Sequence, residues 1–506
     1  MRRSPARQDR ALPLKAASVA GLAVLSLLIA CEPVGPNYSR PEIAIPAQLA
    51  EAEPWQVAMP QETIGRGDWW TVFGDPVLNG LQVEAIKQSP DLKAVAARVL
   101  QAQAVAGIST SYLYPQIDAG GLAQRFANNS NFVTLVPPSP ITDNQARITN
   151  AFKAVPLYAT YEIDFWGRLR RQSESARAEL GASIAAYQTA LLTLNGEVAQ
   201  TYFEVRTTDE LIRLITESIA LHRNTLNLFR ARRTDGLSSD IALSDVETAL
   251  RTTEAQAQTL EAQRIKLVNK LAVLVGTNPE QFTVGKQAYA PSIPSIPVGL
   301  PSELLQRRPD VARAERELAA YNAQIGVAVA AYFPAIVLTS AVGFESYSLS
   351  TLTNPANNIW GVGFSLFQQV FNAGRISLNV ERTRVAYQEK VALYQALLLK
   401  VFQEVETALA GLRLMNQQSK YQQQAVASAN RTAALTAQRY QQGLISLLDV
   451  LVAQRAALAS EAVAVQIAND QLMTTVALIK ALGGGWQDRT QQVPEGSPSM
   501  WAPKLK

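Results

Sequence analysis

The sequence predicts a membrane protein of the α+β class, with four short strands, very long helices and an internal duplication. Two observations carry this prediction. One tract of the chain matches a later tract at a constant spacing. Residues 157–278 and 356–493 lack proline, and each stretch opens with alternating residues that give way to a helical period. The chain has 506 residues, 48% of them hydrophobic, so it can bury a large core.

The N-terminus has the pattern of a lipoprotein signal peptide. Basic residues precede an apolar stretch, residues 16–30, that is too short to span a bilayer comfortably. No later stretch is expected to be a transmembrane helix. It ends in a lipoprotein box, and Cys31 is the only cysteine of the chain, so no intramolecular disulfide is possible. We expect residues 1–30 to be cleaved and Cys31 to carry a covalent lipid. Glu32 follows, where an aspartate would favour inner-membrane retention, so an outer-membrane location is predicted.

The distribution of charge argues against nucleic-acid binding, and the titratable residues argue against an enzyme. The net charge of +4 comes from the first thirty residues, and the remaining acids and bases balance. The single histidine, His222, lies in an apolar stripe without a cysteine partner, which excludes a histidine–cysteine metal site and indicates a packed or snorkelling side chain. Glu162 and Asp164 alternate with apolar residues, and no nucleophile or base is placed opposite them. No cofactor is expected beyond the lipid.

The duplication fixes which parts of the chain correspond. The tract from Gly167 matches the tract from Gly374 at a spacing of 207 residues without a gap. Upstream, Pro115 matches Pro334 at a spacing of 219 residues. The first copy therefore holds 12 additional residues, and they fall in a polar, proline-rich stretch that we expect to be an exposed loop.

Each copy begins with a helix and continues with two strands. Residues 91–111 and 310–331 are alanine-rich, with a proline before the first aspartate as a helix start signal. Residues 157–165 and 360–366 alternate strictly, which predicts strands with one apolar and one polar face. Residues 336–345 fit this pattern less strictly, and residues 117–126 only weakly. Four strands cannot close a barrel, so the pattern predicts a ring of identical chains.

Very long helices follow the strands. Apolar residues from Leu180 to Val205 recur at alternating steps of four and three, which indicates coiled-coil-like packing. A helix over residues 167–233 would be roughly 100 Å long, at about 1.5 Å per residue. A second apolar stripe predicts neighbours on two sides of each helix. Gly236 and Gly443 are expected to end the long helices. Ser238, Ser239 or Asp240 in the first copy, and Ser446 in the second, are expected to cap the returning helices.

Several motifs together resemble the outer-membrane factor family. They are CEPVGPNYSRP, WWTVFGDPVLNGL, DFWGR with its second-copy partner FNAGR, and QGLISLLDVLVAQ. More narrowly, the chain resembles the outer-membrane lipoprotein channels of tripartite efflux systems driven by resistance-nodulation-division pumps. The resemblance implies a homotrimer with a twelve-stranded outer-membrane β-barrel, continued by a periplasmic α-helical barrel. It also implies a periplasmic adaptor, an inner-membrane pump and passage of drugs, toxic organics or metal ions.

The resemblance, with the duplication, gives a domain plan. The predicted segments are a signal peptide at 1–30, a lipidated segment and equatorial region at 31–89, a first repeat at 90–278, a proline-rich equatorial connector at 279–308, a second repeat at 309–484 and a tail at 485–506.

Site residues follow from the same resemblance. Asp449 occupies an acidic gate position, with Leu448 as a candidate constriction beside it. Three copies of Asp449 near one axis would repel, which favours protonation or cation binding. The alternative is a solvated carboxylate near a helix start. The adaptor-contact tips carried over from the family are Gly236, Leu237, Gly443 and Leu444.

Two other functions share some of these features. A type I secretion duct would have the same fold and trimer, but would export a protein with an ATP-driven transporter. A periplasmic coiled-coil adaptor would have long helices, but would lack the four strands. No motif identifies the cargo.

Overall fold

The computed structural model describes residues 32–41, 68–128, 147–235, 239–287, 293–294 and 308–484. The signal peptide, Cys31, two tip residues (Gly236 and Leu237) and the tail lie outside these residues, as do the predicted loop and most of the connector. The described residues form two compact units. The first comprises the described residues of 32–40, 102–180 and 316–391, and the second those of 68–101, 181–315 and 392–484, with residue 41.

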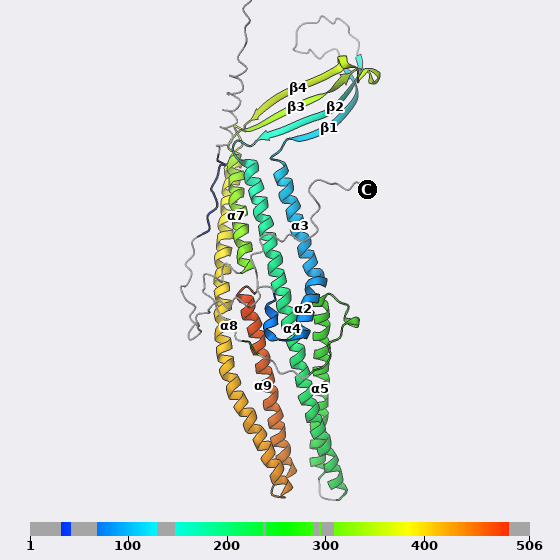
Figure 1. Cartoon of the computed structure of the whole chain (residues 1–506), viewed down its shortest axis with the longest axis vertical. Helices are drawn as coiled ribbons and strands as arrows, with labels where there is room; N and C mark the ends of the chain where they lie inside the picture. Colours follow the sequence, from blue (N-terminus) through cyan, green and yellow to red (C-terminus); the bar gives the residue numbers. More distant parts are fainter. Residues whose placement is uncertain are drawn as a thin grey trace, which may run out of the picture. The chain divides into compact units, whose positions relative to one another are not determined.

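The element order is the same in both halves of the chain (Figure 1). Each half contains a helix of 22 residues, two strands, a helix of 67 residues and a helix of 36 or 35 residues. Helices of 67 residues are about 100 Å long, as predicted. The elements are η1 (Trp69–Phe73), α2 (Pro76–Gln88), α3 (Pro90–Ser111), β1 (Gln116–Asn128), β2 (Arg147–Ile163), α4 (Arg168–Thr234), α5 (Asp240–Val275), η2 (Pro279–Gln281), α7 (Pro309–Ala330), β3 (Ala335–Ser346), η3 (Leu349–Thr351), η4 (Pro355–Asn357), β4 (Asn358–Phe367), α8 (Arg375–Gln441) and α9 (Leu447–Ala481).

The four strands form one antiparallel sheet in the order β1-β2-β3-β4 (Figure 1). This confirms all four predicted strands, including the two with weak alternation. β2 begins earlier than predicted, at Arg147, and its register shifts between Ala154 and Leu157. Pro156 lies within that shift, where its missing N–H does not interrupt the hydrogen-bond ladder. β1 and β4 are the two edges of the sheet.

The core of the second unit is built around the middle of α4. Tyr202 and Phe203 are fully buried there, and Phe203 makes an edge contact with Phe73 of η1 at 4.9 Å between ring centroids. Asp75 caps α2 by accepting the N–H groups of Val77 and Leu78. Its other carboxylate oxygen accepts the hydroxyl of Tyr202 at 2.6 Å. This bond ties α2 to α4 inside the core.

One expectation about hydropathy is wrong. The sequence suggests no membrane-spanning helix after the signal, yet α9 is long and apolar enough to cross a membrane by length and composition alone. The reason is its alanine, leucine and valine content, and 17% of its most apolar stretch is buried. Val450, Leu472 and Val476 of α9 are buried in the second unit, so its apolar character contributes to helix packing.

Candidate functional site

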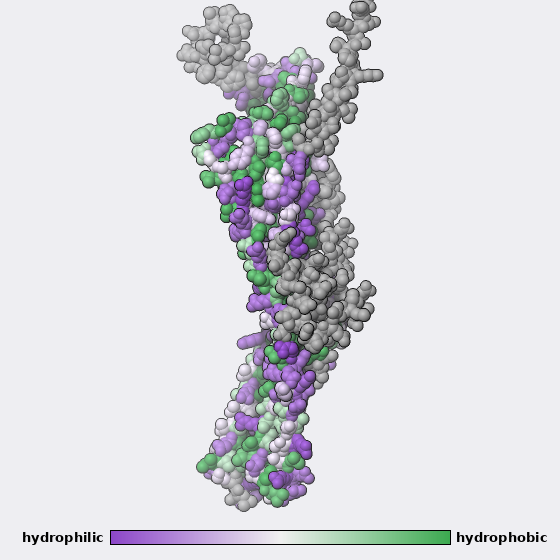
Figure 2. Space-filling model, turned by 90° about the vertical axis from the view of Figure 1, so that its left-hand side faces the viewer, coloured by the Kyte–Doolittle hydropathy of each residue, from purple (hydrophilic) through white to green (hydrophobic). Residues whose placement is uncertain are grey.

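The strand register places apolar side chains of neighbouring strands on one face of the sheet. Leu338 of β3 lies opposite Phe364 of β4, and Val342 lies opposite Trp360. On the other side of β3, Val342 lies opposite Leu157 of β2. Trp360 and Phe364 are 78% and 75% exposed, so this apolar face has no cover among the described residues. Figure 2 shows hydrophobic side chains on the surface, interspersed with hydrophilic ones.

The opposite face of the sheet carries small and polar residues. Thr339 of β3 lies between Thr160 of β2 and Gly363 of β4. Glu162, on the same face, is held by Arg168 through two hydrogen bonds of 2.9 and 2.6 Å. Such a sheet separates an apolar medium from water, as the alternation in the sequence predicts.

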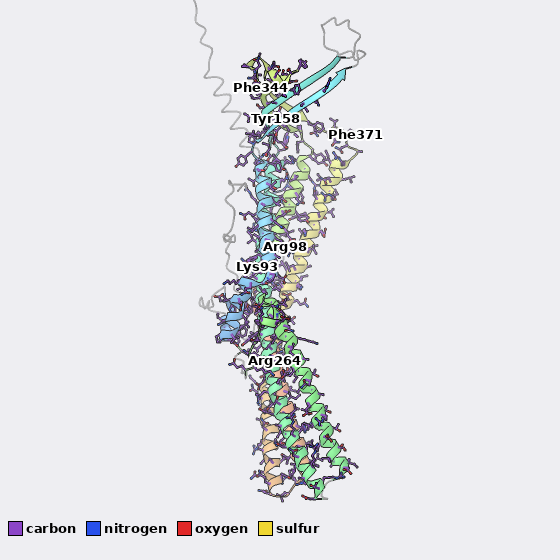
Figure 3. The ribbon with its side chains drawn as sticks, turned by 90° about the vertical axis from the view of Figure 1, so that its right-hand side faces the viewer. Lys93, Arg98, Tyr158, Arg264, Phe344 and Phe371 are labelled. Atoms are coloured by element: carbon purple, nitrogen blue, oxygen red, sulfur yellow. The ribbon has the colours of Figure 1, made fainter. Side chains whose placement is uncertain are left out.

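Aromatic residues gather where the strands meet the helices. Trp166, in the β2–α4 connection, stacks on Phe333 at 4.4 Å between centroids and donates its indole N–H to the Pro334 carbonyl. Phe371 projects from the connection between β4 and α8 and is 84% exposed (Figure 3). Val370 beside it is 94% exposed. Aromatic residues with one polar contact are typical of a membrane–water boundary.

The segment that follows Cys31 is fastened to the same region of the first unit. Arg171 of α4 is 3% exposed, and its guanidinium donates to Asn37 at 2.6 Å and, at 3.4 Å each, to the carbonyls of Pro33, Val34 and Gly35. The Val34 N–H donates to the Trp166 carbonyl. A side chain at Gly35 or Gly167 would collide with the packed backbone of Gly326 or Pro33, and both glycines have positive φ. Residues 32–41 are therefore a packed strap.

The returning helices are capped as predicted. Ser239 accepts the Ala242 N–H at the start of α5, and Ser446 accepts the Asp449 N–H at the start of α9. The Asp449 carboxylate accepts the Ser446 N–H and hydroxyl in return, at 2.9 and 2.8 Å. The structure thus places Asp449 in a capping box, with its side chain exposed.

The α8–α9 turn also exposes the other candidate residues of the second copy. Gly443 has a φ of 74°, and an L-side chain would be strained there. Leu444 and Leu448 are 66% and 60% exposed. Gly236 and Leu237 lie outside the described residues.

One hydrogen bond joins the ends of the two long helices in the second unit. Arg232 of α4 donates to the Tyr440 hydroxyl of α8 at 2.9 Å, and this contact is partly buried. Elsewhere on α4, burial and the charge of Arg455 on α9 lower the pKa of His222, which keeps its imidazole neutral at pH 7. A neutral, half-buried imidazole suits a packing role, as predicted from its apolar stripe.

Comparison with known proteins identifies the family. The family model described as "Outer membrane efflux protein" matches residues 81–277 and 300–484. The chain belongs to the outer membrane efflux protein family. It is 33% identical to the "Pyoverdine export outer membrane protein OpmQ" of Pseudomonas aeruginosa over 477 residues, which cover 92% of this chain and 98% of that protein.

Two further comparisons agree with this membership. The efflux protein is 29% identical to the "Cation efflux system protein CusC" of Escherichia coli, over 90% of this chain and 96% of that one. The solved structure of the Campylobacter jejuni CmeC outer membrane channel superposes with a TM-score of 0.82 at 25% identity, covering 91% and 97% of the two chains. The resemblance found in the sequence, the efflux role and the outer-membrane location are confirmed.

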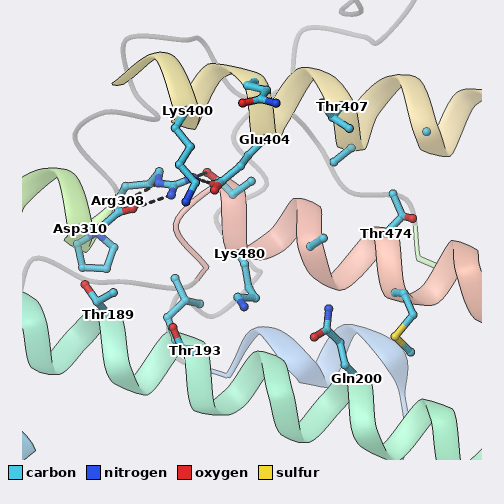
Figure 4. A pocket seen from close by; sticks show the side chains of 18 of the residues that line it. Thr189, Thr193, Gln200, Arg308, Asp310, Lys400, Glu404, Thr407, Thr474 and Lys480 are labelled. Atoms are coloured by element: carbon cyan, nitrogen blue, oxygen red, sulfur yellow. Dashed lines mark hydrogen bonds and ion pairs between the residues drawn. The ribbon is translucent and has the colours of Figure 1, made fainter. Parts of the chain in front are cut away.

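The second unit of this efflux protein contains a cavity of about 810 Å³, lined by both apolar and polar residues (Figure 4). Arg308 is 7% exposed and donates to Asp310, to Glu404 at 2.8 Å and to the Ala481 carbonyl at 3.1 Å, so α7, α8 and α9 meet at one guanidinium. Burial lowers the pKa of Arg308, but hydrogen bonds and charge from Asp310 and Glu404 outweigh it and keep the pKa above the ordinary arginine value. Arg308 thus fastens three helices.

Two contacts of this efflux protein were not foreseen from its sequence. Arg171 and the Arg232–Tyr440 bond each link residues more than 130 positions apart. Backbone carbonyls receive most of the Arg171 bonds, and carbonyls carry no sequence signal. The duplication is the signal that could have indicated the second contact. With a spacing of 207 residues, Tyr440 of the second copy is equivalent to Arg233 of the first, next to Arg232.

Proposed function

We propose that this chain is one subunit of a homotrimeric channel that crosses the outer membrane and continues as an α-helical tube in the periplasm. The observation that carries the proposal is the four-stranded sheet with one apolar and one polar face and two edge strands. An open edge in lipid leaves backbone groups without hydrogen bonds at a cost of several kcal/mol each, so a barrel must be completed by further copies. Three copies would supply twelve strands.

The domain plan predicted from the duplication remains part of this proposal. The described helices and strands of residues 90–275 and 309–481 supply its two repeats. Their 67-residue helices are long enough to extend far beyond a bilayer about 30 Å thick.

We also propose that Cys31 carries the lipid anchor. The strap supports this, because residues 32–41 lead from the position of Cys31 to the aromatic residues at the base of the strands. A lipid attached there would enter the membrane next to Trp166. Mass spectrometry of the N-terminal peptide tests this proposal. We expect an acylated peptide in wild type and no acylated peptide in Cys31→Ser.

The gate of the proposed channel lies at the α8–α9 turn. Asp449 and Leu448 would narrow the opening, and the Arg232–Tyr440 bond would hold α8 against α4 in the closed state. The tip residues Gly443 and Leu444, with Gly236 and Leu237, would meet a periplasmic adaptor, because an exposed leucine beside a helix break is a suitable docking point. The adaptor would join the channel to an inner-membrane resistance-nodulation-division pump.

The cargo of the proposed system is a small molecule or a metal ion. The relatives compared above are named for pyoverdine export and for cation efflux, and neither name points to a secreted polypeptide. The channel itself would have no cofactor and no catalytic step.

The deciding experiment is a crosslinked pull-down of the tagged, full-length protein from intact envelopes, with partners identified by mass spectrometry. Recovery of an adaptor together with a proton-driven pump is the expected result. Recovery of an ATP-driven transporter with a secreted polypeptide would instead assign a type I secretion duct, and would overturn the efflux proposal while leaving the fold intact.

A further inference from the structure

We propose that the β4 edge of one copy pairs with the β1 edge of the next copy in one defined antiparallel register. In this register Leu366 lies opposite Gly121 of the neighbouring copy, and Phe364 lies opposite Ala123. The inference rests on the proposed trimer and specifies its strand seam. Its occupant is a second copy of this chain.

The two hairpins of the sheet are equivalent residue by residue near the helices. In the first hairpin, Ile117 of β1 pairs with Ala159 of β2. In the second, Ile336 of β3 pairs with Leu366 of β4. Ile117 and Ile336 are 219 residues apart, and Ala159 and Leu366 are 207 apart. The sequence duplication gives the same two spacings independently: 219 in the residues before the strands and 207 in the residues after them.

The chain already contains one copy of the seam. β2 ends the first strand pair and β3 begins the second, and they pair directly, with Ala159 opposite Ser340 and Leu157 opposite Val342. β4 is the equivalent of β2, and β1 is the equivalent of β3. Adding 207 to each β2 residue gives its equivalent in β4, and subtracting 219 from each β3 residue gives its equivalent in β1. The two pairs then become Leu366 opposite Gly121 and Phe364 opposite Ala123. The register that joins the two repeats within a chain thus predicts the register that joins two chains.

Side-chain size and exposure agree with this register. Phe364 and Leu366 are 75% and 59% exposed at the β4 edge, and each meets a small partner, alanine or glycine. Continuing the register past the end of β4 brings Val370, 94% exposed, opposite Ile117, which is 67% exposed. That pair is the equivalent of Ile163 and Ile336, which already lie opposite each other in β2 and β3.

A shift of one residue would break the match. Side chains alternate between faces, so such a shift would place the apolar β4 side chains beside residues of the polar face of β1. A shift of two residues keeps the faces but places Phe364 beside Arg125 or Gly121. Pairing of two β4 edges with each other would leave both β1 edges open and would give a dimer.

Cysteine crosslinking in the full-length, membrane-embedded protein tests the register. Phe364→Cys/Ala123→Cys is treated with dibromobimane, which fluoresces when it joins two adjacent thiols. We expect conversion of most of the protein to a fluorescent covalent trimer on a denaturing gel, because each subunit is linked to both neighbours. Leu366→Cys/Gly121→Cys should behave in the same way.

The matched controls keep Phe364→Cys and move the second cysteine. Leu122→Cys and Gln124→Cys test the opposite face, Arg125→Cys and Gly121→Cys test shifts of two residues, and Phe364→Cys alone tests homotypic pairing and reaction with Cys31. Stronger crosslinking of any control than of the Ala123 pair would overturn the register.

Native electrophoresis of the untreated variants separates the two proposals. A trimer without crosslinks in the Ala123 and Gly121 pairs would overturn the seam alone. A monomer or dimer in wild type would overturn the proposed trimeric channel.

Discussion

The two helical hairpins, α4–α5 and α8–α9, are equivalent in sequence but are held together differently. In the first, Arg223 donates to Glu254 at 2.9 Å, Arg230 lies 3.7 Å from Glu247, and Arg233 forms an ion pair with Asp240. At the equivalent positions of the second hairpin, 207 residues later, stand Asn430 with Glu461, Ala437 with Gln454, and Tyr440 with Leu447. Of these three pairs, all among the described residues, only the first is hydrogen-bonded, through the Asn430 amide N–H and the Glu461 carboxylate at 2.8 Å.

This difference indicates which hairpin can move. Arginine–carboxylate pairs are stronger and more directional than amide bonds, so α4 and α5 are fastened along their length. In the second hairpin, the residue at the Arg233 position, Tyr440, bonds across to Arg232 of α4 instead of to its own hairpin partner. The second hairpin is thus bonded to the first near its tip, and in the proposed channel the gate would open by releasing α8–α9 from α4.

Fixing this contact should have the largest effect. In Arg232→Cys/Tyr440→Cys, a short bis-maleimide linker would tie α8 to α4 permanently. We expect reconstituted channels to lose nearly all conductance after linking, and each single-cysteine variant to keep it. Linked channels that still open would show that α8 does not need to leave α4.

Removing the contact should have the opposite effect. Tyr440→Phe removes the acceptor hydroxyl and keeps the ring. A hydrogen bond to a charged, partly buried donor is worth about 1–2 kcal/mol, so the open fraction should rise roughly five- to thirtyfold. Single-channel recording measures this, and Tyr421→Phe, on the same helix with 63% exposure, is the matched control. Equal behaviour of the two variants would remove Tyr440 from the gate.

Asp449 can be tested for charge and capping separately. Asp449→Ala removes both, while Asp449→Asn removes the charge and keeps an acceptor for the Ser446 N–H. If the charge narrows the gate, both variants should raise the conductance of reconstituted trimers and relieve block by divalent cations. If only the cap matters, Asp449→Ala alone should change and should lower thermal stability by about 1 kcal/mol. Unchanged conductance and cation block in both variants would exclude Asp449 from the gate.

Making the hairpins more alike should have a smaller effect. Asn430→Arg recreates in the second hairpin the pair that Arg223 and Glu254 form in the first. An exposed ion pair contributes about 0.2–1 kcal/mol, so we expect the free energy of unfolding to rise by that amount, with the channel's open fraction unchanged because the pair lies within one hairpin. Asn430→Gln, which adds length without charge, is the control, and an equal change of stability in both variants would contradict the role of charge.

Acid should weaken the ion pairs of Glu254 in the first hairpin, and this is the smallest of the expected effects. Hydrogen bonds from Arg223 and Arg251 hold the pKa of Glu254 below its ordinary value. The stabilisation is therefore complete above the unfolded-state pKa of about 4.3, and is lost as the pH falls through the lower folded-state value. The difference in unfolding free energy between wild type and Glu254→Gln should be constant from pH 7 to 5 and shrink below about pH 4. A constant difference at all pH values would contradict the ion pair.

Much of the fold could be predicted because its signals are local and repeated. The alternation in β2 and β4, the absence of proline in α4 and α8, and the serines before α5 and α9 each lie within a few residues of the structure they specify. The start of β2 was missed because Pro156 interrupts the alternation, and the register shift that accommodates it is not visible in composition.

The site was less predictable, because its contacts are distant in sequence. The position of Asp449 followed from the family motif, but its engagement with Ser446 depends on the geometry of one turn. Arg171 is a charged residue on a helix with many charges, and its burial arises only when Asn37 and the strap pack on α4. The hydropathy of a window cannot reveal a guanidinium that is enclosed by backbone carbonyls.

The strap bears on how such a channel would assemble. If Cys31 is acylated, each subunit is held at the bilayer surface by a few residues bound to the base of its own strands. Subunits confined to a surface meet in two dimensions, which raises their effective concentration over that of freely diffusing chains. The buried Arg171 would then fix how far the lipid lies from the base of the strands, and so how each confined chain is oriented when it meets the next.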